Sequence, residues 1–219
     1  MFTTRLVKPE LLDHAAPEEA RANLDELVKI NQRFGGHSVI KKVLTETVRT
    51  NDQFTLLDIG AGSGDTARLI HALYPRAVVT SLDYRAVHIE TAPKPKLVAD
   101  AFALPFLPDS FDYVMCNLFL HHFNDDQVVT MLRTFYSIAH TALLVCDLER
   151  RLLPYLFLPA TRPLFGWKRI TLHDGPISVR ASFRSAELRE LSTRAGIADA
   201  CIKTHRPAFR ISLSARKRQ

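Results

Sequence analysis

The stretch Leu56-Leu57-Asp58-Ile59-Gly60-Ala61-Gly62-Ser63-Gly64-Asp65 decides the fold. An apolar run that begins at Phe54 reaches an acidic residue, breaks into a loop with glycine at every second position, and resumes as an apolar segment from Thr66 to Tyr74. This order predicts a strand, a tight turn and the start of a helix, the first unit of an α/β nucleotide-binding sheet. Glycine suits the turn because a side chain would keep the backbone away from a ligand. An ordinary glycine-rich loop has the same pattern, so other strands must indicate the ligand.

Two more acidic residues end apolar runs. The segment from Ala77 to Leu82 predicts a second strand that ends at Asp83, which follows Gly64 by 19 residues. Nucleotide-binding units space these residues by about 20, and their carboxylate accepts hydrogen bonds from both ribose hydroxyls. A third, short strand ends at Asp100, whose carboxylate can accept from an exocyclic amine while apolar neighbours cover the ring faces. Together these carboxylates predict an adenosine site.

The remaining pattern fits a single domain. A chain of 219 residues with 47% hydrophobic residues is long enough for one full core. An amphipathic helix opens at Pro17, Gly35-Gly36 ends it, and a second helix is predicted from Ser38 to about Thr50. The polar joint Asn31–His37 between them is either a helix-helix turn or a pocket edge. Further predicted elements are a strand at 110–117, a helix capped at 124–126 that runs to 138, a strand at 141–146 and a helix from 185 to 196.

Charge and cysteine usage restrict the class of protein. The net charge of +6 is spread along the chain, and its densest cluster, Arg216-Lys217-Arg218, predicts a solvated, frayed tail. Nucleic-acid binding is therefore disfavoured. Cys116, Cys146 and Cys201 lie in apolar segments, so we expect them to be reduced and buried. We expect no metal site, because the histidines and cysteines lack zinc-ligand spacing.

The chain shows no signal for export or for crossing a membrane. Residues 1–10 contain no continuous apolar region, so no signal peptide is predicted. The longest apolar candidate is interrupted by Pro154, Pro159, Arg162 and Pro163 and falls short of transmembrane length. We therefore expect a soluble, cytoplasmic protein.

Four motifs carry a family resemblance. The order LLDIGAGSGDTA, VVTSLDY, LVADAFALPF and FDYVMCNLFLHHF resembles that of class I S-adenosylmethionine-dependent methyltransferases, over roughly residues 54–148. The flanks also resemble a smaller group of bacterial methyltransferases found with polyketide-type biosynthesis, through Asn31–His37, Cys146–Arg150 and His173–Arg180. This second resemblance fixes no substrate.

The resemblance implies an α/β, Rossmann-like fold. The sheet would have seven strands, mostly parallel with an antiparallel final strand, helices on both faces and an N-terminal helical cap. The closing pair is expected at 197–203 and 207–213. One methyltransferase domain, 1–219, would comprise a cap at 1–52, a cofactor-binding core at 53–148, a substrate lid at 149–182 and a closing helix with strands at 183–219. The implied contacts to S-adenosyl-L-methionine are Asp58, Gly60, Ala61, Gly62, Gly64, Asp83, Tyr84, Asp100, Ala101 and Asn117.

The glycine loop itself favours this cofactor over a dinucleotide. A dinucleotide fingerprint would have its third glycine one place later, where the chain has Asp65, and would bind pyrophosphate at the helix N-terminus. Asp58 and Asp65 on either side of the loop would repel a pyrophosphate but suit a cationic sulfonium and an ammonium group.

The acceptor is expected under the insertion that follows the fifth strand. Residues 152–159 and 163–167 are rich in leucine, aromatic residues and proline. They form either a lid of short helices or a monotopic membrane anchor flanked by Arg150, Arg151, Lys168 and Arg169. The lid is favoured, because the prolines leave no long amphipathic helix and lids over reactive sites commonly exclude water. Either structure predicts a lipophilic or aromatic acceptor.

Methyl transfer is an in-line displacement, so alignment and desolvation supply much of the rate and a base matters mainly for a hydroxyl acceptor. The candidate catalytic residues are His121, His122 and His173. The first two lie after the fourth strand and could instead pack the loop or line the cofactor site, whereas Asp174 could orient His173. The predicted acceptor contacts are Arg33, His37, Tyr155, Trp167, Asp174 and Arg180.

The predicted function is methylation of a small hydrophobic or phenolic metabolite, with oxygen as the favoured acceptor atom. Two alternatives stay open at this point. One is a cofactor-binding regulatory or scaffold protein without turnover, which would lack an acceptor pocket under the insertion. The other is a nucleic-acid methyltransferase, although the fourth strand ends in Asn117-Leu118-Phe119 instead of an amino-methylation motif. The sequence leaves the oligomeric state open.

Overall fold

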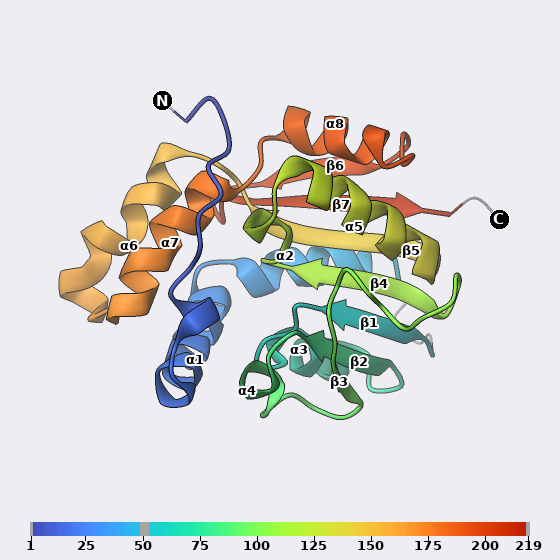
Figure 1. Ribbon diagram of the computed structural model, residues 1–219, viewed down its shortest axis with the longest axis horizontal. Coiled ribbons are helices and arrows are strands. Elements are labelled where there is room, and N and C mark those ends of the chain that lie inside the picture. The colour runs from blue at the N-terminus through green and yellow to red at the C-terminus, as the bar shows by residue number, and fades with distance from the viewer. Residues whose placement is uncertain (1, 49–52, 218–219) are drawn as a thin grey trace.

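The computed structural model describes residues 2–48 and 53–217. Its centre is a seven-stranded sheet in the order β3-β2-β1-β4-β5-β7-β6 (Figure 1). The pairs from β3 to β5 are parallel, whereas β7 is antiparallel to both β5 and β6. This confirms the predicted fold. The strands are β1 (Thr55–Ile59), β2 (Val78–Asp83), β3 (Lys96–Val98), β4 (Phe111–Asn117), β5 (Ala139–Leu148), β6 (Cys201–His205) and β7 (Arg210–Arg216).

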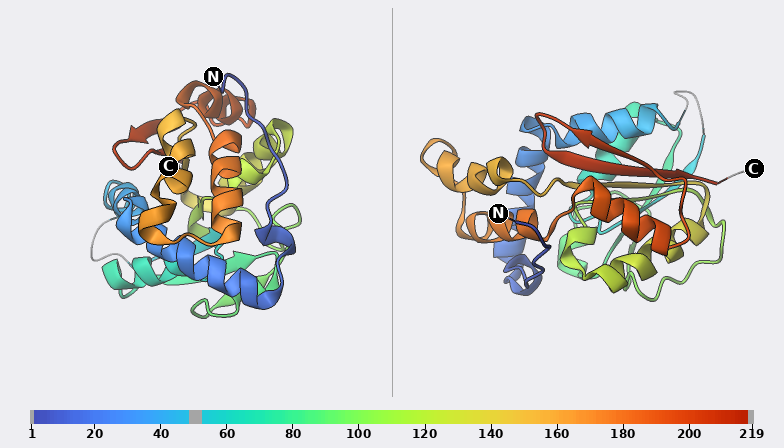
Figure 2. Two further views of the ribbon diagram at one scale, coloured as in Figure 1. Left: turned by 90° about the vertical axis from the view of Figure 1, so that its left-hand side faces the viewer. Right: turned by 90° about the horizontal axis from the view of Figure 1, so that it is seen from above.

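Helices cover both faces of the sheet and one of its ends (Figure 2). Alternate residues of a strand point to opposite faces, and the core is divided accordingly. Leu57 and Val114 join the cluster under α5 and α8, while Leu56 and Met115 join the cluster under α2 and α3. The α-helices are α1 (Pro17–Arg33), α2 (Gly36–Thr45), α3 (Asp65–Leu73), α4 (Ala86–Ile89), α5 (Asp125–Ile138), α6 (Leu152–Phe165), α7 (Arg169–Ala181) and α8 (Ser185–Arg194), with short 3-10 helices η1 (Leu12–His14) and η2 (Leu120–His122).

The end of the sheet that carries the site is closed by α1, α6 and α7 (Figures 1 and 2). The N-terminal segment, residues 2–16, crosses this end and is fastened to it. The Arg5 guanidinium donates to the carbonyl oxygens of Ala181 and Phe123, and the amide of Leu6 donates to the carbonyl of Arg180. The insertion after β5 therefore packs against the start of the chain.

The insertion differs from the expected short helices. α6 is continuous over 14 residues and includes Pro159 and Pro163 inside the helix. Each proline removes one backbone hydrogen bond, which ordinarily breaks a helix. α6 has no buried residue, so the carbonyl groups that the prolines leave unbonded can be hydrated. The prediction that proline interruption prevents a long helix was wrong for this reason.

Smaller differences concern element ends. The closing strands begin three or four residues later than predicted, because Pro207, which cannot donate to a strand ladder, lies in the turn between them.

Cys201 is exposed on the edge strand β6, so the expectation of three buried cysteines was wrong there. Arg216 ends β7 and the amide of Lys217 donates to the carbonyl of Thr141, so the tail is paired up to this point. Arg218 and the predicted end of the second helix near Thr50 lie outside the described residues.

No helix in the described ranges combines the length and the hydrophobicity needed to cross a bilayer.

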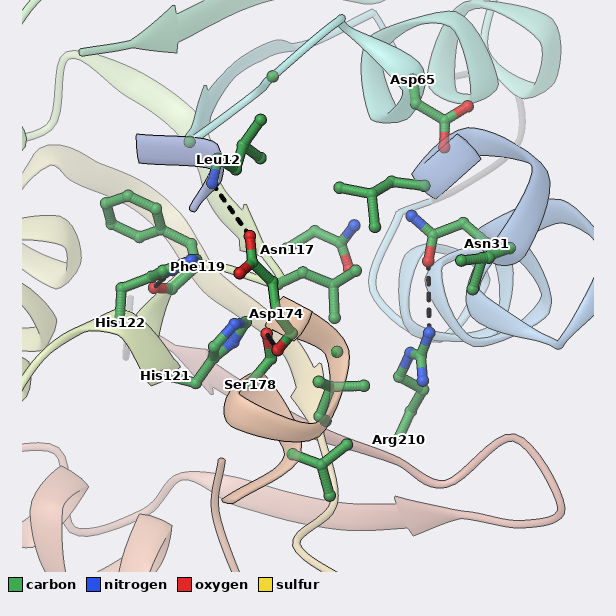
Figure 3. Close-up of a pocket in the computed structure, with 18 of the residues that line it drawn as sticks. Leu12, Asn31, Asp65, Asn117, Phe119, His121, His122, Asp174, Ser178 and Arg210 are labelled. Carbon is green, nitrogen blue, oxygen red and sulfur yellow. Dashed lines mark hydrogen bonds between the residues drawn. The ribbon is translucent and has the colours of Figure 1, made fainter. Parts of the chain in front are cut away.

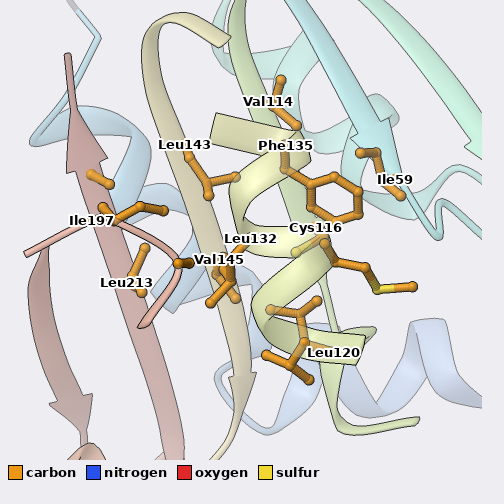
Figure 4. Packing of buried hydrophobic residues seen from close by; sticks show 14 of the residues in the cluster. Ile59, Val114, Cys116, Leu120, Leu132, Phe135, Leu143, Val145, Ile197 and Leu213 are labelled. Carbon is orange, nitrogen blue, oxygen red and sulfur yellow. The ribbon is translucent and has the colours of Figure 1, made fainter. Parts of the chain in front are cut away.

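Phe135 is the central core residue of α5 (Figure 4). It is fully buried among strands β1, β4 and β5. Phe135→Ala should lower the free energy of unfolding by about 3–5 kcal/mol, because the cavity cannot fully collapse. Urea denaturation measures this. Leu107→Ala, at a position that is 78% exposed, is the control and should change stability by less than about 0.5 kcal/mol. Equal effects of the two variants would contradict the assignment of this core.

Candidate functional site

A cavity of about 1570 Å³ opens at the carboxyl ends of the parallel strands, where the strand order reverses between β1 and β4. Ligands bind at such switch points in open α/β sheets. The glycine loop and the ends of β2 and β4 form one side, and residues of α1, α6 and α7 form the other. The cavity is therefore shared by the cofactor core and the insertion.

The glycine loop follows β1 and requires glycine at two positions. Gly60 has φ +72°, and a Cβ there would lie 2.3 Å from the Phe119 ring. Gly64 has φ +80°, and a Cβ there would lie 2.7 Å from Ala92. Both conformations are rare for residues with a side chain. The loop therefore presents bare backbone to the cavity at the start of α3.

Asp83 ends β2 beside this loop. The amide of Gly62 donates to Asp83 Oδ2 at 3.0 Å, and the amide of Arg85 donates to Oδ1 at 3.1 Å. His88 Nδ1 lies 3.2 Å from Oδ1. Burial tends to raise the pKa of this carboxyl, but His88 and the two backbone donors hold the pKa below its ordinary value. Asp83 is therefore a buried carboxylate on the cavity wall, with lone pairs left for further donors.

The other predicted adenosine contacts lie around the same opening. Asp100 comes just after β3, is exposed, and accepts from the amide of Phe102 at 2.9 Å. Tyr84, with 73% of its surface exposed, and Phe102 place aromatic rings on the cavity wall. Asn117 ends β4, and the next residue, Leu118, has φ +53°, a strained backbone for a bulky residue of the kind found at functional sites.

Asp58 lies behind the glycine loop instead of on the cavity wall. Its Oδ2 atom is buried and has no hydrogen-bond partner among the described residues. Burial and the nearby carboxylates of Asp83 and Asp65 raise its pKa from 3.8 to about 7. An unpaired buried carboxyl behind bare backbone fits a ligand that brings positive charge to the loop, as a sulfonium and an ammonium group would.

The raised pKa of Asp58 predicts a pH-dependent stability. The folded chain holds the proton more strongly than the unfolded chain, so this group's contribution to stability is lost as pH rises from about 4 through about 7. Asp58→Asn removes the free-energy cost of ionising this buried carboxyl at high pH. Its thermal midpoint should exceed that of the wild type at pH 8, and the difference should narrow at pH 5. Asp100→Asn, a substitution at an exposed carboxylate, is the control. If the thermal midpoints of both variants changed equally between pH 5 and pH 8, the assignment of a buried carboxyl with a raised pKa at Asp58 would be contradicted.

On the opposite side, His121 and His122 point into the cavity from η2 (Figure 3). Their rings stack at 4.3 Å between centroids. His121 Nδ1 lies 2.6 Å from Oδ1 of Asp147, which is fully buried at the end of β5. Asp147 also accepts from the backbone amides of His121 and Leu148. The orientation of His121 is therefore fixed from behind.

Glu10 of the N-terminal segment completes this group. One carboxylate oxygen lies 3.2 Å from His122 Nε2 and the other 3.8 Å from His121 Nε2, and Ser178 Oγ donates to Glu10 Oε1 at 2.5 Å. Burial opposes both charges, but their mutual contact lowers the pKa of Glu10 to about 2 and raises the pKa of His122 to about 9. In the chain alone, Glu10 and His122 therefore form a buried ion pair.

Several predicted residues lie elsewhere. His173 is exposed, pairs with Asp174 at 2.7 Å, and does not line the cavity, because α7 turns it outward while Asp174 faces inward. Asp174 accepts from the amides of Leu11 and Leu12 and so fastens the N-terminal segment (Figure 3). Of the three candidate histidines, the pair after β4 lines the cavity and His173 does not.

Other predicted acceptor contacts also support the wall from outside the cavity. Tyr155 packs on the Phe2 ring, and the Arg180 guanidinium lies over the same ring. Trp167 stacks on Phe165. The ring Nε2 of His37 is hydrogen-bonded to the Asp65 carboxylate at 2.8 Å. Three of these predicted contacts lie on helices that turn their side chains away from the cavity, and Trp167 lies in the connection between α6 and α7. Arg33 is exposed and does line the cavity.

Sequence reasoning did not identify Glu10, Ser178 or Arg210. Arg210 is buried in the first position of β7, lines the cavity and donates to Asn31 Oδ1 at 3.3 Å (Figure 3). Its Nε has no partner among the described residues, and burial lowers its pKa to about 10. Only the polarity of the Asn31–His37 joint signalled this part of the wall.

Comparison with known proteins agrees with this geometry. Residues 56–141 match the model of a family described as a methyltransferase domain. The match covers less than half of the chain. The chain is 31% identical over 97 residues to a demethylmenaquinone methyltransferase of Thermotoga maritima, over 42% of each chain. It is 36% identical over 77 residues to a ubiquinone/menaquinone biosynthesis C-methyltransferase of Desulfotalea psychrophila, over 32% of this chain and 31% of that one. The match spans less than half of either relative.

Solved structures share the fold of the chain. Human N-acetylserotonin methyltransferase in complex with S-adenosylmethionine has a TM-score of 0.65 at 20% identity, over 93% of this chain and 57% of that one. An S-adenosylmethionine-dependent methyltransferase from Aquifex aeolicus has a TM-score of 0.62 at 13% identity, over 92% of this chain and 98% of that one. At these identities the likeness concerns the fold alone.

Proposed function

We propose that the protein transfers the methyl group of S-adenosylmethionine to an oxygen atom of a small lipophilic or phenolic acceptor. One observation carries the proposal: the glycine loop with Asp83 and the apolar underside of α6 face one continuous cavity. When bound, the cofactor supplies an electrophilic methyl group. The Gly60–Gly64 backbone, Asp83 and Asp100 would hold its polar parts, and the rings of Tyr84 and Phe102 would cover its base.

The acceptor side supports the proposed substrate class. Leu153, Leu156, Phe157 and Leu158 of α6 line the cavity and would exclude water from the reacting atoms. The names of the curated relatives refer to quinone biosynthesis, which is consistent with a lipophilic ring. Transfer to oxygen is favoured because the His121–His122–Glu10 group faces the cavity and could receive a hydroxyl proton. Product analysis distinguishes this from transfer to carbon, which the name of the second relative suggests.

The apolar cavity under the insertion also bears on the alternatives. A regulatory or scaffold protein without turnover needs no acceptor pocket, and a nucleic-acid enzyme needs a basic entrance. The cavity wall is instead mainly leucine and phenylalanine on the α6 side. An enzyme acting on a small molecule is therefore the function that we favour.

Cofactor binding is the direct test. Calorimetry should detect S-adenosylmethionine binding by the wild type, and Asp83→Ala should weaken it at least ~10-fold, since hydrogen bonds to a charged group contribute about 1.5–3 kcal/mol each. His173→Ala, at an exposed site outside the cavity, is the control and should bind like the wild type. Absence of wild-type binding would remove the proposal, and unchanged affinity in Asp83→Ala would remove the ribose assignment.

A lipid surface is the proposed source of the acceptor. Outside the cavity, α6 exposes Leu152 and Leu164, the latter with 78% of its surface in solvent. No acidic residue occurs between Glu149 and Asp174, whereas this stretch has several arginine and lysine residues. An exposed apolar helix with a basic surround binds anionic interfaces.

Vesicle sedimentation tests this contact. The wild type should sediment with phosphatidylglycerol vesicles and far less with phosphatidylcholine vesicles. Leu164→Glu should abolish sedimentation, because it places a negative charge in the apolar face. Leu107→Glu is the matched control, since Leu107 is also 78% exposed but lies in the loop before β4. Failure of the wild type to sediment with either lipid would exclude the membrane contact.

A further inference from the structure

Three potential metal ligands meet on the acceptor side of the cavity. They are a carboxylate oxygen of Glu10 and one ring nitrogen each of His121 and His122, and these ligand atoms all lie within 4.8 Å of one another. Glu10 and His121 are buried and His122 is partly buried. Two imidazoles and one carboxylate are a recurrent ligand set for zinc and for non-haem iron.

Hydrogen bonds fix which ring nitrogen of each histidine is available. His122 Nδ1 lies 2.9 Å from the carbonyl oxygen of Phe119, which can only accept, so Nδ1 carries a hydrogen. His121 Nδ1 donates in the same way to the carboxylate of Asp147 at 2.6 Å. Both Nε2 atoms therefore face Glu10, which is itself an acceptor. In the chain alone a proton on His122 Nε2 meets the Glu10 carboxylate, and a metal ion could replace that proton.

The arrangement around His121 is that of a metal-ligating histidine. Such histidines ordinarily donate the second ring N–H to a carboxylate or a backbone carbonyl, which fixes the tautomer and the ring orientation. Asp147 supplies the carboxylate for His121 and Phe119 supplies the carbonyl for His122. Ser178 Oγ holds the Glu10 carboxylate from the other side. Each of the three ligands thus has a second partner behind it.

The distances are also compatible with one ion. Bonds of about 2.0–2.2 Å in a tetrahedral site separate neighbouring ligand atoms by about 3.4 Å. His122 Nε2 lies 3.2 Å from one Glu10 carboxylate oxygen and His121 Nε2 lies 3.8 Å from the other, so each imidazole is near this separation from a carboxylate oxygen.

We propose that Glu10, His121 and His122 bind one divalent transition-metal ion, of the zinc, iron(II) or manganese class, with an open coordination position toward the cavity. The role of that open position rests on the proposed function: an acceptor hydroxyl bound there would lose its proton more readily and would be aligned for methyl transfer. Metal binding itself does not depend on methyl transfer.

The sequence prediction of no metal site considered only the spacing of histidines and cysteines. It did not include Glu10, which lies more than a hundred residues before His121 and reaches the site because the N-terminal segment is tied to α7. The competing state is a proton in place of the ion, shared between Glu10 and His122.

Binding is tested on full-length, tag-free protein that has been stripped with a chelator. Calorimetry with Zn²⁺, and separately with Mn²⁺ and Co²⁺, should find one ion per chain for at least one of them. Glu10→Ala and His122→Ala should each weaken that binding by at least ~100-fold, more than the 10–100-fold typical of outer-shell changes. His140→Ala, which removes an exposed histidine at the far end of β5, is the matched control and should bind like the wild type.

Further readouts keep the outcomes distinct. Visible absorption of Co²⁺-loaded wild type reports nitrogen and oxygen coordination even if a variant fails to fold, and Asp147→Asn should perturb that spectrum as a positioning residue. No binding of any of the three ions, or equal binding by all variants, overturns the metal site in favour of the proton-held pair. Metal binding without S-adenosylmethionine binding would reject the proposed function alone, and the reverse result would reject the metal site alone.

Discussion

A fully buried carboxylate organises the active end of the sheet. Asp147 has no exposed surface, so its charge must be met by donors within the chain. It obtains them from the ring and amide of His121 and from the amide of Leu148. Burial tends to raise its pKa, yet these groups hold the pKa below the ordinary value. Satisfying this charge fixes η2 against the end of β5, and with it the direction of both histidines.

The N-terminal segment extends this constraint to the insertion after β5. Glu10 meets the two histidines, and the amides after it donate to Asp174 of α7. One chain of polar contacts therefore connects β5, η2, the start of the chain and the insertion. On the other side of the cavity, the glycine loop and Asp83 are fixed by backbone amides and by the nearby side chains of Arg68 and His88. The cofactor side is thus local in sequence, whereas the acceptor side is assembled from distant segments.

This contrast explains which predictions succeeded. The loop at Gly60–Gly64 and the carboxylates that end β2 and follow β3 are determined by short-range geometry, so their neighbourhood could be predicted from spacing. His173 could not be placed in the same way, because a single turn of α7 decides that Asp174 faces the cavity and His173 faces solvent. α6 was misjudged for a related reason, since the cost of proline in a helix depends on whether the unbonded carbonyls are buried.

By itself, the sequence determined the α/β class, the order of the core strands and the glycine loop, because alternating apolar residues and glycine act over a few neighbouring positions. Only the tertiary structure decided that Glu10, His121 and His122 lie together and that Arg210 and Asn31 meet in the cavity wall. Contacts between residues so far apart depend on how whole elements pack. No local sequence pattern specifies which distant residue will pair with a buried charged side chain.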